Sequence, residues 1–136
     1  MLIDDDEPTN YLSNMIIEEA NCTDHIKIMD TSERALHYLA DSAKSAYNDE
    51  CSWPDLIFLD INMPAMNGWE FLDKYNKLEK AHKDKIVVVM LTTSINPDDE
   101  VKAKNIAGVT DFKLKPLTHE ILTGILDTYF THSLKW

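Results

Sequence analysis

Side chains that could do chemistry follow several short apolar segments of this chain. Most of them are acidic, and two threonines and a lysine accompany them. If those segments are parallel strands of one sheet, the residues after them converge on one edge, where such sheets place their ligands. The sequence therefore predicts one acidic cluster with a lysine and a hydroxyl, drawn from Asp4, Asp5, Asp6, Asp60, Thr92, Thr93 and Lys115.

Carboxylates gathered in this way repel one another. At about 4 Å, two of them repel by roughly 4 kcal/mol at an effective dielectric of about 20, which corresponds to about three pKa units. Either protons enter the cluster, as in a paired-carboxylate acid–base site, or a hard divalent cation does. Oxygen ligands favour Mg²⁺ or Mn²⁺, and a carboxylate beside such a cation and a lysine can attack a phosphoryl group. This reasoning predicts an acyl phosphate at Asp60.

The elements that would position these residues alternate between strand and helix. Residues 1–3, 56–59 and 86–91 are almost wholly apolar, as expected for strands that helices cover on both faces. Residues 25–29 and 112–114 are two further candidate strands. Right-handed crossovers between successive strands then predict an α/β fold. It is a doubly wound five-stranded parallel sheet, (βα)5, in the flavodoxin-like order 2-1-3-4-5.

Apolar residues at helical spacing predict the helices that follow the strands. The stripes, each expected to face the sheet, are Leu12, Met15 and Ile16; Leu36, Leu39, Ala40 and Ala43; Phe71, Leu72, Tyr75 and Leu78; and Ile121, Leu122, Ile125, Leu126 and Tyr129. The fourth helix should begin after Asn96 as N-cap, with Pro97 at its first position. The fifth should run from about residue 118 to about residue 132.

The composition fits one globular domain over residues 1–136, which is long enough for a core of its own. A formal net charge of -11 argues against nucleic acid and anionic membranes as partners, because both would repel an acidic surface. Neither a signal peptide nor an apolar run of membrane-spanning length is recognisable. We therefore expect a cytoplasmic protein that binds cations or basic partners.

Four motifs stand at the predicted strand ends. They are Leu2-Ile3-Asp4-Asp5-Asp6, Leu59-Asp60-Ile61-Asn62-Met63-Pro64 with Asn67-Gly68, Met90-Leu91-Thr92-Thr93-Ser94, and Lys115-Pro116. In this order they resemble the response-regulator receiver (phosphoacceptor) domain family of two-component signalling. The resemblance covers essentially the whole chain, and the segment from Asp60 to Gly68 is its most specific part.

The resemblance implies a role for each acidic residue of these motifs. Asp60 would be the phosphoacceptor. Asp5 would bind Mg²⁺ directly, Asp4 would act largely through water, and the backbone carbonyl of Asn62 would supply another metal oxygen. The spacing within the family favours Asp4 and Asp5 as the metal pair, while Asp5 and Asp6 remain the alternative.

The resemblance also implies how the site would respond to phosphorylation. Thr92 would move to hydrogen-bond the phosphoryl group, Lys115 would pair with it, and Phe112 would be the aromatic switch linked to Thr92. Pro116 would shape the turn that holds Lys115, by a cis peptide bond in most relatives. Thr93 departs from the smaller residue that is usual at its position, and its methyl group could narrow access to the phosphoryl group.

The function implied is a phosphorylation-dependent signalling switch rather than a turnover enzyme. A histidine kinase or histidine phosphotransfer protein would donate the phosphoryl group, and a downstream protein would read the state at the fourth helix, fifth strand and fifth helix. Two alternatives are a phosphatase of the haloacid-dehalogenase type and a phosphorylation-independent interaction module. The phosphatase usually needs a second Asp where this chain has Asn62.

Overall fold

Strands and helices alternate along the chain in the computed structural model, which describes residues 1–23, 25–44, 54–78, 86–93 and 96–130. The strands are β1 (Leu2–Ile3), β2 (Ile28–Met29), β3 (Leu56–Asp60), β4 (Val87–Thr92) and β5 (Asp111–Leu114). The helices are α1 (Glu7–Ala20), α2 (Ser32–Lys44), α3 (Gly68–Asn76), α4 (Pro97–Asn105) and α5 (His119–Tyr129).

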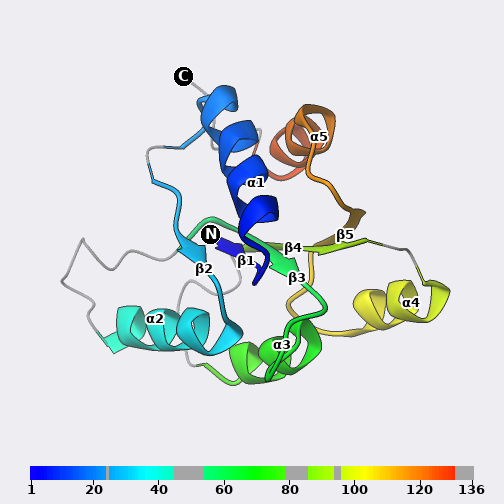
Figure 1. The fold of residues 1–136 in the computed structure, drawn as a ribbon. Coiled ribbons are helices and arrows are strands. Elements are labelled where there is room, and N and C mark those ends of the chain that lie inside the picture. Colours follow the sequence, from blue (N-terminus) through cyan, green and yellow to red (C-terminus); the bar gives the residue numbers. More distant parts are fainter. Residues whose placement is uncertain (24, 45–53, 79–85, 94–95, 131–136) are drawn as a thin grey trace.

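The strands form one parallel sheet in the order β2-β1-β3-β4-β5. Helices α1 and α5 cover one face, and α2, α3 and α4 lie on the other (Figure 1). The α/β fold class and the 2-1-3-4-5 order are therefore confirmed. Because all strands run the same way, the segments that follow β1, β3, β4 and β5 meet at one edge of the sheet.

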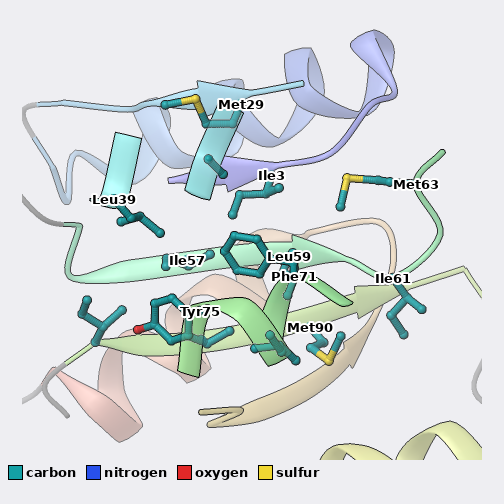
Figure 2. Packing of buried hydrophobic residues seen from close by; sticks show 14 residues of the cluster. Ile3, Met29, Leu39, Ile57, Leu59, Ile61, Met63, Phe71, Tyr75 and Met90 are labelled. Carbon is teal, nitrogen blue, oxygen red and sulfur yellow. The ribbon is translucent and has the colours of Figure 1, made fainter. Parts of the chain in front are cut away.

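The sheet separates two apolar cores. On the face covered by α2 and α3, Ile57 and Leu59 of β3 pack with Leu39, Phe71 and Tyr75 (Figure 2). Neighbouring residues of the same strands point to the other face, as the alternation of a strand requires, and pack with residues of α1 and α5. The buried members of that second core are Leu2, Ile17, Phe58, Val87, Val89, Leu91, Leu117, Leu122 and Ile125.

Three predicted helices agree with the structure, α3 and α5 in their buried faces and α4 in its first residues. The stripe of α3 is buried at Phe71, Leu72 and Tyr75, whereas Leu78 packs against the core from beyond the end of the helix. That of α5 is buried at Leu122 and Ile125. In α4, the side chain of Asn96 accepts a hydrogen bond from Asp98 N, and Pro97 occupies the first turn, as predicted. The prediction that α5 reaches about residue 132 extends beyond Tyr129 into a segment outside the described residues.

The predicted face of α1 is wrong at two of its three residues, because Ile16 packs against the second core as expected but Leu12 and Met15 do not. Leu12 and Met15 are 56% and 39% exposed, whereas Asn10, Ser13 and Ile17 are buried. Leu12 lies about 200° around the helix from Asn10, because each residue turns the helix by about 100°. The hydrogen bond that Asn10 donates to the backbone of Asp4 fixes which face is buried, and apolar periodicity alone does not report it.

The second strand is shorter than predicted. Only Ile28 and Met29 pair with β1, because β1 itself contributes just Leu2 and Ile3 to that ladder. In α2, Leu39 is fully buried and Leu36 packs against the core, as expected, while the side chain of Ala43 lies outside the described residues. Among the residues that the structure describes, no helix has the length and apolar character needed to cross a membrane.

Candidate functional site

Three carboxylates meet where β1 and β3 end. The register that pairs Ile3 with Leu59 brings the next residue of each strand, Asp4 and Asp60, side by side. One oxygen each from Asp4, Asp5 and Asp60 lies within 4.8 Å of the other two. Asp4 and Asp60 are 6% and 7% exposed, whereas Asp5 is exposed. Two buried acids and one accessible acid therefore form an oxygen-rich site at the edge of the sheet.

Lys115 bridges the two buried carboxylates. Its Nζ atom donates to Asp4 Oδ2 at 2.6 Å and to Asp60 Oδ1 at 2.9 Å. The backbone N–H of Lys115 donates to Thr92 O at 2.6 Å, which joins the end of β5 to the end of β4. The Lys115–Pro116 peptide bond is cis, as the resemblance implied. The side chain of Lys115 is 11% exposed, so this ion pair is largely shielded from water.

Burial and charge act together on the protonation of this cluster. Burial raises the pKa of Asp60, the hydrogen bond from Lys115 opposes that rise, and the charges of Asp4 and Asp5 add to it. Burial by itself would lower the pKa of Lys115, but the hydrogen bonds to Asp4 and Asp60 outweigh it and raise the pKa. Lys115 thus stays charged, and it pairs with Asp4 and Asp60, two of the three carboxylates. The donor set fits a hard divalent cation such as Mg²⁺.

Asp6 belongs to the start of α1 rather than to this cluster. Its side chain is the N-cap of the helix and accepts a hydrogen bond from Thr9 N at 3.0 Å. Hydrogen bonds from the hydroxyl and backbone of Thr9 lower the pKa of Asp6. The Asp6 N–H in turn donates to Asp4 Oδ1 at 2.9 Å. Of the two candidate pairs, the geometry favours Asp4 and Asp5.

The loop after Asp60 leads directly into α3. Asn62 is exposed two residues after Asp60, and the Gly68 N–H donates to Ile61 O at 2.8 Å, which closes the loop. A Cβ atom at position 68 would lie 2.6 Å from Asp60 O, closer than any side chain tolerates. Asn67 and Glu70 form a capping box at the start of the helix. The Asn67-Gly68 pair therefore brings α3 against the backbone of Asp60.

The remaining predicted residues lie on β4, directly after it, and on β5. Leu91 pairs with Asp60, so Thr92 is one residue beyond it at the same edge, and it is 3% exposed. Thr93 is exposed next to it. Phe112 is half-buried in β5, where it pairs with Met90 and packs against the core under α3. Thr92 is thus placed at the site, and Phe112 lies further back along the sheet.

Sequence analysis missed Asn10. This residue is 6% exposed on α1, and its Nδ2 atom donates to Asp4 O at 2.8 Å. Asparagine in the second turn of a helix carries no distinctive signal, since it is usually solvated there.

Known proteins resemble this chain along nearly its whole length. The sequence profile described as the response regulator receiver domain matches residues 1–127. Hybrid signal transduction histidine kinase C of Dictyostelium discoideum is 32% identical over 130 residues, which are 93% of this chain and 10% of that protein. Two-component response regulator ARR6 of Arabidopsis thaliana is 27% identical over 143 residues, covering 99% of this chain and 74% of ARR6.

A solved structure shows the same fold. The crystal structure of a two-component response regulator from Cytophaga hutchinsonii superposes with a TM-score of 0.84 at 31% identity, covering 96% of this chain and 94% of that one. A response regulator receiver protein from Dyadobacter fermentans has a TM-score of 0.79 at 22% identity, which supports the fold alone. Several curated relatives are much longer, since the chain spans 10%, 20% and 50% of three of them.

Proposed function

This chain belongs to the response regulator receiver domain family, and we propose that it is a phosphorylation-dependent switch whose phosphoacceptor is Asp60. Receiver domains are signalling domains rather than turnover enzymes, and they interact with histidine kinases or phosphotransfer proteins. The observation that carries the proposal is the position of Asp60, buried beside Asp4 and held by Lys115 at 2.9 Å.

The acidic cluster is proposed to hold Mg²⁺, with Mn²⁺ as a substitute. The ligands are the carboxylates of Asp4, Asp5 and Asp60 and the backbone carbonyl of Asn62, with Asp4 acting largely through water. These oxygens suit a hard cation, and the three carboxylates already lie within reach of one another. When bound, the ion neutralises charge on the phosphoryl oxygens during transfer.

The donor is a phosphohistidine on a histidine kinase or histidine phosphotransfer protein. A carboxylate oxygen of Asp60 attacks phosphorus, the P–N bond breaks, and its electron pair returns to the imidazole ring of the donor. An acyl phosphate remains on Asp60. Lys115, already 2.9 Å from Asp60 Oδ1, then pairs with a phosphoryl oxygen and stabilises its charge.

The phosphoryl group then changes the surface that a partner contacts. The Thr92 hydroxyl hydrogen-bonds the phosphoryl group, and Phe112 repositions with it. The face of α4, β5 and α5 carries two exposed apolar side chains, Val101 at 58% and Leu114 at 44%, which supports a protein partner there. A net charge of -11 disfavours nucleic acid or a membrane as partner, and the proposed location is the cytoplasm.

Acetyl phosphate and Mg²⁺ provide a direct test. Mass spectrometry should find one phosphoryl group on the wild type and on Asp73→Ala, whose carboxylate is 70% exposed on the surface of α3. Asp60→Ala should carry none. An equal adduct on Asp60→Ala, or none on the wild type, would reject Asp60 as the acceptor.

The same material separates the proposal from its two alternatives. Turnover of p-nitrophenyl phosphate at ordinary enzyme rates would favour a phosphatase, although Asn62 stands where a phosphatase of the haloacid-dehalogenase type needs an acid. Calorimetric titration with Mg²⁺ tests the interaction module. A switch should bind Mg²⁺ and lose that binding in Asp5→Ala, whereas an interaction module should show no such binding.

A further inference from the structure

Asn10 is a buried polar residue that contacts the candidate site from outside the predicted set. It lies on the inner face of α1 and is 6% exposed. Its side chain donates to Asp4 O at 2.8 Å, and its backbone N–H donates to Asp6 O at 3.0 Å. The second contact is the first backbone hydrogen bond of α1, and the first, to Asp4 O, is the one that depends on the asparagine side chain.

The acidic run is tied to the rest of the site through Asp4. The Asp4 N–H donates to Met29 O at 3.1 Å, and the Asp4 carboxylate accepts from the Asp6 N–H and from Lys115 Nζ. Asp4 is buried, and the side chain of Asn10 supplies a hydrogen-bond donor to its backbone carbonyl. The direction of the Asp4 carboxylate, and of Asp5 after it, therefore depends on the backbone that Asn10 holds.

We propose that Asn10 is a positioning residue that keeps the carboxylates of Asp4 and Asp5 beside Asp60 before a cation binds. This inference rests on the proposed function, because it concerns the same Mg²⁺ site. The three carboxylates repel one another. Lys115 offsets this repulsion at Asp4 and Asp60, and fixed backbone contacts help to keep all three within 4.8 Å in the metal-free chain. A contact to the ligand-bearing loop that does not touch the metal can change metal affinity by about 10- to 100-fold.

Magnesium affinity tests the proposal with a matched control. Asn10→Leu keeps the number and branching of the side-chain heavy atoms, Asn10→Ala truncates the side chain at Cβ, and both remove the donor to Asp4 O. Ser13→Ala is the control, because Ser13 is equally buried on the same face of α1, one turn further from Asp4. By calorimetric titration, both Asn10 variants should raise the dissociation constant for Mg²⁺ by about tenfold, and Ser13→Ala should change it less than twofold.

Hydrogen exchange in the metal-free chain gives a readout that needs no Mg²⁺. The Asp6 amide, which donates to Asp4 Oδ1, should exchange about tenfold faster in Asn10→Leu than in the wild type, and Ser13→Ala should leave it unchanged. Equal effects of Asn10→Leu and Ser13→Ala in both measurements would overturn the proposal. If the wild type bound no Mg²⁺, the proposed function would fail. The exchange rate of the Asp6 amide would still show whether Asn10 positions the acidic run.

Discussion

Helices α3 and α1 cover opposite faces of the sheet and bury different kinds of side chain. In α3, the buried face is mostly apolar, and the rings of Phe71 and Tyr75 stack with their centroids 5.8 Å apart. In α1, the buried residues are Asn10, Ser13 and Ile17, so two of the three are polar. The α3 face is a packing surface, whereas the α1 face combines packing with contacts to the acidic run.

The difference follows from where each helix begins. Both helices start beside the site, but α3 follows a loop that is closed through Gly68, and its side chains then reach the core. Helix α1 starts within the acidic run, where Asp6 is its N-cap, and Asn10 on its second turn meets the Asp4 carbonyl. The residues displaced outward include Tyr11 and Leu12, which are 66% and 56% exposed. A helix that supports a charged loop therefore gives up part of its apolar burial.

The largest effect is expected at Phe71. This side chain is fully buried in the core under α3, so Phe71→Ala should lower the free energy of unfolding by about 3–5 kcal/mol. Urea denaturation would measure it. Val101→Ala, at a side chain that is 58% exposed, should change stability by less than about 0.5 kcal/mol. A loss below about 1.5 kcal/mol for Phe71→Ala would contradict the assignment of this face as a packing surface.

The next effect concerns the point where α3 meets the site. Gly68→Ala would place a Cβ atom 2.6 Å from Asp60 O, and the backbone shift needed to relieve it should cost about 1–3 kcal/mol. Gly124→Ala is the matched control in α5, where an added Cβ meets no atom within 4 Å. It should stabilise the helix by about 0.5–1 kcal/mol. Thermal unfolding should therefore shift in opposite directions, and a shared direction would argue against this packing.

The contrast between the two helices also shows what could be predicted from sequence. The site was predictable because parallel strands bring the residues after them to one edge, so Asp4, Asp60 and Lys115 could be grouped without coordinates. The buried face of α3 was predictable because the core there is filled by apolar side chains at helical spacing. The α1 face was not, because apolar periodicity counts side-chain types and cannot register that Asn10 finds a buried carbonyl as its partner.

The charged edge between the two faces should respond to pH. Burial raises the pKa of Asp60, so the folded chain binds that proton more tightly than the unfolded chain, and ionised Asp60 lowers stability above the raised pKa. Without metal, Asp60→Asn should therefore stabilise the protein by about 1 kcal/mol at pH 7, since its amide oxygen can still accept from Lys115. The gain should shrink as the pH falls and vanish below the ordinary value of 3.8, where both states are protonated.

Urea denaturation of both proteins in EDTA across this pH range would measure the difference. Phosphotransfer plays no part in it, so the measurement concerns only the electrostatics of the folded chain. A loss of stability at pH 7 would mean that pairing with Lys115 outweighs the burial of Asp60. A gain that does not depend on pH would mean that ionisation of Asp60 is not its cause.

The smallest expected effect is the change in stability caused by Leu12→Gln. It tests which face of α1 is buried. If Leu12 faced the sheet, Leu12→Gln would remove a buried apolar side chain and cost at least about 2 kcal/mol. Leu12 is 56% exposed, so the change should stay within about 0.5 kcal/mol. Ile17→Ala, at a side chain that is 7% exposed on the opposite side of the same helix, should cost about 2–5 kcal/mol. A loss of about 2 kcal/mol or more for Leu12→Gln, together with a loss below about 0.5 kcal/mol for Ile17→Ala, would restore the expected face of the helix.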